Sequence, residues 1–292
     1  MIGLWGCFIA IVGLGYSLTL YLLVRSGSLV RPMVDCPQGS FNFLRHYAAL
    51  ICCMILGGLA VAGDAPTRAS AEKDHEFQLI RLRYNNHPQF SSFRSSWMTD
   101  APEAETHLLN GVQRLTLIDT AADSIGLSAM DDRLFEYPFL YAVEVGHWAL
   151  SDAEAKRLRD YLLKGGFLIV DDFHGTQEWL VFAESMQKVF PDRPIVDLGD
   201  KDAVFHVLFD VNQRVQIPNI RGALNGQSWE KDGFTPRWRG IFDDEGRLMV
   251  AINFNMDLGD AWEHADNPDY PQPLTLLAYH FGIDYILYAM TH

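Results

Sequence analysis

Two apolar segments joined by one strongly marked helix constrain the fold of this chain more than any other feature. Segments 139–143 and 167–170 carry continuous apolar side chains, which is typical of strands buried on both faces of a parallel sheet. Between them, residues 151–164 begin with a capping box of Ser151 and Glu154 and stop before Gly165, so we expect a helix. Because such a strand–helix–strand unit closes as a right-handed crossover, the sequence predicts an α/β fold with a mainly parallel sheet flanked by helices.

Weaker patterns predict the other elements of a single α/β domain over residues 76–292. Alternating or continuous apolar residues favour strands, and apolar residues three or four positions apart favour helices. We expect further strands at 77–82, 114–118 and 248–253, helices at 176–189, 202–209 and 274–290, and a long loop or small insertion over 212–239.

The first 71 residues are predicted to form a membrane anchor or a signal region. Residues 2–24 form an uncharged run of 23 residues, and about 20 apolar residues can cross a bilayer as a helix. A second apolar run, 47–63, precedes the small residues Ala69, Ser70 and Ala71, which are typical of a signal cleavage site. Two alternatives stay open: a two-helix anchor, and an export signal that begins at Met33 and is cleaved.

Both alternatives place the α/β domain on the same side of the membrane. Arg25, Arg31 and Arg45 lie between the two apolar runs, and positively charged short loops stay in the cytoplasm. We therefore expect a membrane-anchored or exported protein whose C-terminal domain is periplasmic or extracellular.

Charge and cysteine content exclude several functions. The chain has a net charge of −14, to which the first 75 residues contribute +1, so the α/β domain carries −15. Such a surface repels phosphate backbones, which argues against nucleic acid as a partner. All four cysteines lie in the N-terminal region, which excludes thiolate catalysis and cysteine-bound zinc from the domain. The domain also lacks a glycine-rich phosphate loop and a G-x-S-x-G motif.

Polar side chains follow both apolar segments where the predicted strands end. Glu144 and His147 follow the first segment, and Asp171, Asp172 and His174 follow the second. Ligands bind beyond the carboxyl ends of parallel strands, so we expect these loops to be neighbours. Asp171, Asp172 and His174 are therefore candidate ligands of a divalent metal and, with His147, candidate catalytic residues. The alternative is that Asp171 or Asp172 caps the following helix.

A third polar segment, residues 257–263, follows the strand expected at 248–253. Its acids and tryptophan are typical of a ligand loop, although Asp-Leu-Gly-Asp also occurs in turns. Arg83, at the end of the first strand, can pair with the acids or hold an anionic ligand. We expect residues 257–263 to close over the polar cluster. The predicted ligand-binding residues are Arg83, Glu144, Asp257, Asp260, Trp262 and Glu263.

Several phrases resemble a bacterial family, domain of unknown function 4159, from about residue 77 to the C-terminus. They are Phe-Glu-Tyr-Pro-Phe-Leu-Tyr at 135–141, Leu-Ser-Asp at 150–152, Lys-Gly-Gly-Phe at 164–167, Asp-Asp at 171–172 and Asp-Leu-Gly-Asp-Ala-Trp-Glu at 257–263. The resemblance implies a flavodoxin-like fold similar to class I glutamine amidotransferases. The nucleophilic cysteine of those enzymes is absent, so glutaminase activity is not expected. The family has no settled activity, and its usual gene neighbours imply envelope proteins as partners.

Two functions fit these observations. The first is a non-catalytic module that binds a ligand or a protein in the cell envelope, because this role needs only a fold, an anchor and a polar site. The alternative is a metal-assisted hydrolase that uses the carboxylates and histidines at the strand ends. The small-molecule ligand stays unknown in either case.

Overall fold

The computed structural model describes residues 8–14, 17–23, 75–90 and 95–292, and the chain divides into the units Met1–Glu72 and Lys73–His292. In the first unit, β1 (Phe8–Leu14) and β2 (Ser17–Leu23) pair as antiparallel strands. This differs from the single helix predicted over 2–24, and the β-branched residues Ile9, Ile11 and Val12 favour a strand. No helix among the described residues is long and apolar enough to cross a membrane. The run 47–63 and the residues Ala69 to Ala71 lie outside the described residues.

The second unit is built on a seven-stranded sheet with the order β5-β3-β6-β8-β11-β10-β9. The first five strands in this order are parallel, and β10 and β9 pair antiparallel at the far edge. The mainly parallel sheet predicted from the sequence is confirmed. The strands are β3 (Ile80–Arg83), β5 (Ile125–Ser128), β6 (Phe139–Val143), β8 (Phe167–Asp171), β9 (Val196–Asp197), β10 (Arg237–Phe242) and β11 (Leu248–Phe254).

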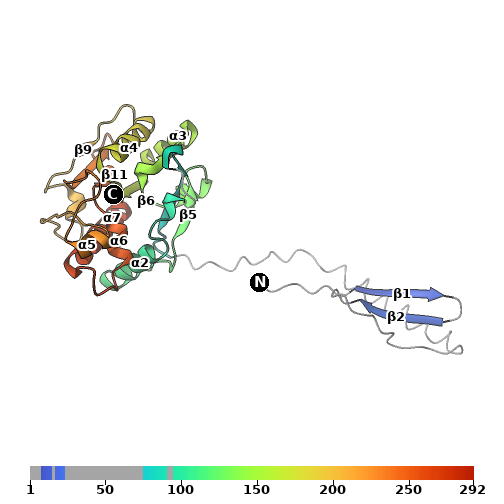
Figure 1. Ribbon diagram of the computed structural model, residues 1–292. Helices are drawn as coiled ribbons and strands as arrows, with labels where there is room; N and C mark the ends of the chain where they lie inside the picture. Colours follow the sequence, from blue (N-terminus) through green and yellow to red (C-terminus); the bar gives the residue numbers. More distant parts are fainter. Residues whose placement is uncertain (1–7, 15–16, 24–74, 91–94) are drawn as a thin grey trace. The chain divides into compact units, whose positions relative to one another are not determined.

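Helices cover both faces of this sheet (Figure 1), so the central strands are buried on both sides. On one face lie α2 (Glu103–Leu115), α6 (Leu258–Glu263) and α7 (Gln272–Thr291). On the other lie α3 (Asp152–Leu163) and α4 (Gly175–Val189). The remaining elements are α5 (Ile220–Asn225), the short strands β4 (Asn85–Asn86) and β7 (Trp148–Ala149), and 3-10 turns at Pro88–Phe90, Ser96–Met98, Asp132–Glu136, Val145–His147 and Ala203–Phe205.

The crossover predicted from the sequence is present as β6–α3–β8. Ser151 caps α3: its Oγ accepts a hydrogen bond from Glu154 N at 3.3 Å, and Ser151 N donates to Glu154 Oε2 at 2.9 Å. Strands β6 and β8 pair in parallel along their whole length. This unit aligns the loops after the two strands at one edge of the sheet.

Three expectations were wrong in detail. The strand expected at 114–118 is absent: residues 114 and 115 end α2, and residues 116–118 are irregular. The helical spacing of Ala104, Leu108 and Val112 outweighs a five-residue alternation, and Leu117 is fully exposed. The helix expected at 202–209 is one 3-10 turn, Ala203–Phe205. The region 212–239 contains α5 and the start of β10, whose alternating residues pair with β11.

Candidate functional site

The carboxyl edge of the sheet contains an unusual row of backbone conformations. Three parallel strands, β6, β8 and β11, are each followed at once by a non-glycine residue in the left-handed region. These residues are Glu144 (φ 53°), Asp172 (φ 52°) and Asn255 (φ 63°). Left-handed non-glycine residues cost free energy and concentrate at functional sites. The same edge holds the point between β3 and β6 where the order of strand addition reverses, since β5 lies on one side of β3 and β6 on the other. Ligands bind at such a point in open α/β sheets.

Asp100, Asp172 and Asp257 form the most buried group at this edge. One side-chain oxygen from each lies within 4.8 Å of the others, and the three residues are 8%, 7% and 3% exposed. Asp100 reaches the group from the loop before α2, Asp172 from the end of β8, and Asp257 from the start of α6. Asp100 Oδ2 is buried without a hydrogen-bond partner among the described residues. We call this group the aspartate cluster.

The aspartate cluster concentrates negative charge in a buried place. Burial, followed by the charges of Asp172 and Asp260, raises the pKa of Asp100 to about 9. Burial and the same two charges raise the pKa of Asp257 well above its ordinary value. Asp100 therefore holds a proton near neutral pH unless a cation offsets the repulsion, and the same causes oppose ionisation of Asp257.

Asp172 also belongs to a second group, with His174 and Glu230. His174 Nε2 lies 3.2 Å from Asp172 Oδ1 and 3.7 Å from Glu230 Oε1. His174 is buried at the start of α4, and Glu230 comes from the loop between α5 and β10. An imidazole and two carboxylates thus face one another beside the aspartate cluster.

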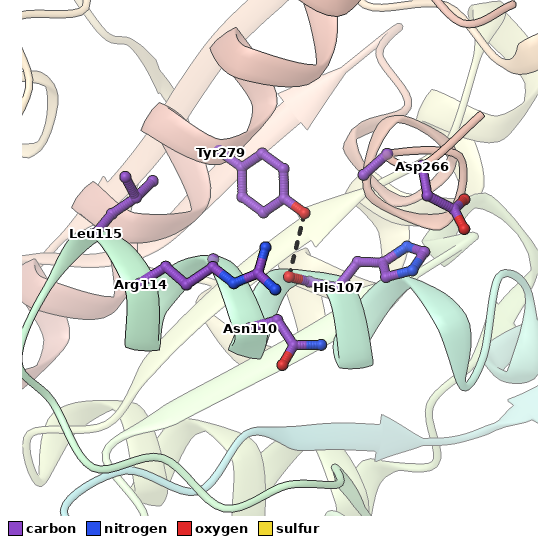
Figure 2. Close-up of a pocket in the computed structure, with 8 residues that line it drawn as sticks. His107, Asn110, Arg114, Leu115, Asp266 and Tyr279 are labelled. Atoms are coloured by element: carbon purple, nitrogen blue, oxygen red, sulfur yellow. Dashed lines mark hydrogen bonds between the residues drawn. The ribbon is translucent and has the colours of Figure 1, made fainter. Parts of the chain in front are cut away.

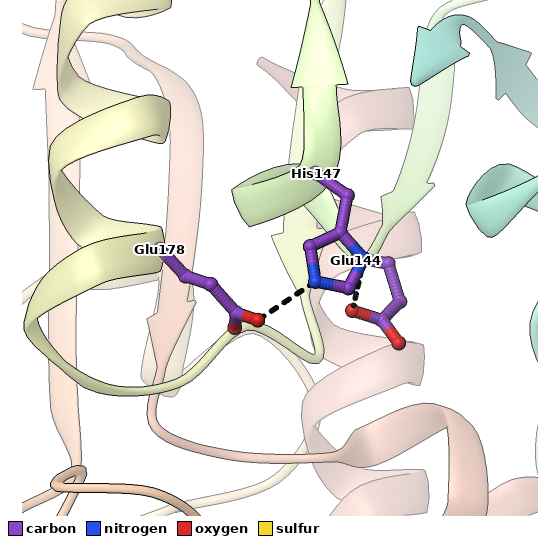
Figure 3. A group of neighbouring side chains, drawn as sticks. All are labelled: Glu144, His147 and Glu178. Atoms are coloured by element: carbon purple, nitrogen blue, oxygen red, sulfur yellow. Dashed lines mark hydrogen bonds and ion pairs between the residues drawn. The ribbon is translucent and has the colours of Figure 1, made fainter. Parts of the chain in front are cut away.

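A third group joins Glu144, His147 and Glu178 (Figure 3). His147 lies between the two acids: its Nδ1 is 3.1 Å from Glu144 Oε2, and its Nε2 is 2.8 Å from Glu178 Oε1. Lys231 also contacts Glu178 Oε1. A lysine therefore offsets negative charge in this group, whereas no lysine or arginine of the described residues forms an ion pair with the aspartate cluster.

The two acids of the third group have opposite pKa shifts. Burial alone would raise the pKa of Glu178, but the hydrogen bond from His147 and the charge of Lys231 lower it to about 2. Burial and the charges of Asp172 and Glu178 raise the pKa of Glu144 to about 10. An ionised and a protonated carboxyl group therefore flank one imidazole, an arrangement that can pass a proton.

Two buried residues hold the loops that carry these groups. Arg81 pairs with Glu105 and donates hydrogen bonds to Trp97 O at 2.9 Å and Thr99 O at 2.6 Å, which fixes the segment before Asp100. Asp171, fully buried, accepts from Leu258 N at 2.7 Å and from Gly259 N at 3.0 Å, so it holds the start of α6 next to β8. Asp171 thus anchors a helix behind the site.

The other residues predicted to bind a ligand lie in different surroundings. Asp260 Oδ2 accepts from Ile220 N at 2.5 Å, and Asp260 groups with Glu263 and His264 along α6. Trp262 is completely buried and packs against Tyr141 with ring centroids 5.6 Å apart. Arg83 is exposed and its guanidinium lies 5.3 Å from the Trp97 ring.

The ion pair considered for Arg83 belongs to its neighbour Arg81, which faces the covered part of the sheet. The alternative that Asp171 or Asp172 caps α4 is wrong. Asp232 takes that role, since its Oδ1 accepts from Thr176 N at 2.9 Å and its Oδ2 from Thr176 Oγ1 at 2.6 Å. The Asp172 side chain does not cap α4 and instead belongs to the aspartate cluster and to the second group.

Sequence reasoning missed Asp100, Glu178, Glu230 and Lys231. Asp100 was detectable, because recognising α2 as the crossover between β3 and β5 would have placed the loop before it at the carboxyl edge. Glu178 stands in the first turn of α4, and Gly146 lets it approach, since a Cβ there would collide with the Glu178 side chain. Glu230 and Lys231 come from a loop without a periodic pattern, so no local signal marked them.

A separate groove of about 520 Å³ lies between α2 and α7 (Figure 2). His107, Asn110 and Arg114 line it from α2, and Tyr279 donates a hydrogen bond across it to His107 O at 3.2 Å. The groove follows the second half of α2, whereas Asp100 precedes that helix. It is thus distinct from the aspartate cluster.

Comparison with known protein families gives a match over most of the chain. The family model described as "Domain of unknown function (DUF4159)" matches residues 78–290, which include the aspartate cluster and the other groups of titratable side chains described above. No curated protein matches the chain.

Proposed function

The chain belongs to the DUF4159 family, a domain of unknown function, and we propose that its α/β domain binds a divalent cation in the aspartate cluster. The observation that carries this proposal is the convergence of three buried carboxylates, one with an unpartnered oxygen. Within the described part of the chain, no lysine or arginine forms an ion pair with Asp100, Asp172 or Asp257. Buried charges need a partner, and a divalent cation supplies one.

The donor set indicates which cations fit. Three carboxylate oxygens are hard ligands, which suit Mg²⁺, Ca²⁺ and Mn²⁺ better than soft metals. Asp257 is already oriented, because its Oδ1 accepts a hydrogen bond from Asp260 N at 2.7 Å as the cap of α6. Because α6 already fixes the Asp257 carboxylate, less conformational entropy is lost when a cation binds.

We propose that the domain acts as a binding module of the cell envelope rather than as a glutaminase. The chain order of the five parallel strands, 2-1-3-4-5, supports a flavodoxin-like fold similar to class I glutamine amidotransferases. Residues after Glu76 include no cysteine for the nucleophile of those enzymes. The bound cation would then organise the carboxyl edge for a further small ligand or for an envelope protein.

The alternative is a metal-assisted hydrolase, and one observation favours it. His147 lies between Glu144 and Glu178, at the same edge as the aspartate cluster, and the two acids have pKa values of about 10 and about 2. Paired acids with separated pKa values are typical of acid–base sites. Hydrolysis would need the cation as a Lewis acid and His147 as the proton carrier.

Cation titration tests the proposed function. The full chain in detergent, stripped of metal, should bind Mn²⁺, and Asp172→Asn should weaken binding at least tenfold. Asparagine suits this test because it tolerates the left-handed conformation at φ 52°. The control is Glu245→Gln, which neutralises an exposed carboxylate elsewhere. Equal affinity in Asp172→Asn and the control would contradict the proposal.

A topology experiment tests the proposed location. We infer from Arg25, Arg31 and Arg45 that the region between the apolar runs stays in the cytoplasm, so the C-terminus lies outside. A reporter that is active only outside the cytoplasm, fused after His292, should be active. Replacing the three arginines with glutamate should lower this activity. Activity of a cytoplasm-specific reporter at the same position would exclude both the anchor and the export signal.

A further inference from the structure

Asp172 occupies a position shared by two groups of possible ligands. It belongs to the aspartate cluster with Asp100 and Asp257, and to the second group with His174 and Glu230. A carboxylate has two oxygens and can join two cations, as in enzyme sites whose metal ions lie about 3.5–4 Å apart. Asp172 has a left-handed backbone conformation, and its carboxylate lies within ligand distance of both groups.

The second group is a mixed donor set rather than a collection of acids. His174 is 2% exposed, and its Nδ1 has no hydrogen-bond partner in the part of the chain that the structure describes. The other nitrogen, Nε2, faces both Asp172 Oδ1 and Glu230 Oε1. A neutral imidazole nitrogen with two carboxylate oxygens is a usual donor set for Zn²⁺, Mn²⁺ and Fe²⁺.

The backbone and side chains of this group are held before any cation binds. Asn219 Nδ2 donates to Glu230 Oε1 at 2.6 Å, and His174 N donates to Glu178 Oε2 at 2.6 Å. Gly175 N donates to Asn255 Oδ1 at 2.9 Å, which ties the start of α4 to the end of β11. Hydrogen bonds of this kind orient the side chains that bind a metal, so less conformational freedom is lost when the cation binds.

Charge balance supports two cations rather than one. The two groups together hold four carboxylates, those of Asp100, Asp172, Asp257 and Glu230. One divalent cation offsets half of this charge, and a second offsets the rest. Lys231, the nearby side-chain cation, already contacts Glu178 in the third group.

We propose that Asp172 bridges two divalent cations, the first held with Asp100 and Asp257 and the second with His174 and Glu230. This inference rests on the proposed function, because the first cation is the one proposed there. Two bridged cations would present adjacent open positions to an oxygen ligand.

Counting bound Mn²⁺ tests the second cation. The full chain in detergent, stripped of metal and reloaded, should hold two Mn²⁺ per chain with spin coupling in electron paramagnetic resonance. Glu230→Gln should hold one Mn²⁺ without coupling. Glutamine keeps an oxygen that can accept from Asn219, so the loop is retained. Glu245→Gln is the matched control and should still hold two. Melting of the metal-free variants checks that each is folded.

The outcomes separate the two proposals. One Mn²⁺ in the unaltered chain, lost in Asp257→Asn but kept in Glu230→Gln, would overturn the second cation and leave the proposed function standing. Absence of bound Mn²⁺ in the unaltered chain would overturn both. Two uncoupled Mn²⁺ would overturn the bridging role of Asp172.

Discussion

Among single residues, Asp100 and Glu144 are two carboxyl groups whose pKa values are strongly raised in the folded protein. Burial is the largest cause, followed for both by the charge of Asp172, and their pKa values are about 9 and about 10. Their ordinary values are 3.8 and 4.5, so the folded protein takes up protons that the unfolded chain does not hold. Such groups contribute stability that is present below the unfolded pKa and lost as the pH rises through the folded pKa.

We therefore expect the metal-free protein to melt at progressively lower temperatures between about pH 5 and pH 9. The double variant Asp100→Asn/Glu144→Gln should show a shallower decline, because it cannot lose these protons. The pKa of His206 is raised by its hydrogen bonds to Asp200 and Asp210, so His206 also makes stability fall with pH. Its effect is the same in the unaltered protein and in the double variant. Thermal melting with a chelator measures both slopes. If the melting temperature fell equally with pH in both proteins, the two carboxyl groups would not have raised pKa values in the fold.

At the scale of elements, α3 is capped by its own residues, whereas α6 has a local cap, Asp257, and also depends on a distant residue. The capping box of Ser151 and Glu154 satisfies backbone N–H groups within four residues of each other. The first N–H groups of α6 are instead satisfied by Asp171, at the end of β8. Loss of the Asp171 carboxylate would therefore disturb the sheet edge, whereas loss of Ser151 weakens one helix.

Ser151→Ala should lower the free energy of unfolding by about 1 kcal/mol, the usual cost of losing an N-cap side chain. Cation binding should be unchanged, since α3 contributes no side chain to the three groups. Urea unfolding measures the change, and Lys156→Ala, an exposed substitution in the same helix, is the control. A loss in Lys156→Ala as large as that in Ser151→Ala would contradict the capping argument.

At the scale of the whole molecule, the α/β unit begins at Lys73 and contains both hydrophobic cores. It has no cysteine and is strongly acidic. Nothing in its composition requires a disulfide, and like charges on its surface oppose association.

A chain spanning residues 72–292 should therefore be folded and soluble without detergent or reductant, and monomeric or weakly associated. Circular dichroism and size-exclusion chromatography measure this. The full chain, which retains the two apolar runs, is the comparison and should need detergent. A 72–292 chain that dissolves only in detergent would show that the boundary between the two regions is misplaced.

The amino-acid sequence alone determined the parts of this protein whose signals are local. The β6–α3–β8 crossover follows from two apolar segments and a capping box, because neighbouring residues decide burial and helix initiation. The polar residues that follow the strands, Glu144 and Asp172, are located by the same pattern, since β6 ends with its apolar run and β8 ends one residue after it. Membership of the DUF4159 family, too, was recognisable from short phrases.

Only the tertiary structure decided which of these polar groups meet. Asp100 and Asp257 reach Asp172 because β3, β8 and β11 lie in one sheet, and their order depends on packing between residues far apart in the sequence. Packing between distant residues also buries Trp262 completely, although the acids Asp260 and Glu263 lie beside it in the sequence. Glu230 and Lys231 reach the site on a loop positioned by Gln216, Asn219 and Asn255, whose contacts no local pattern encodes.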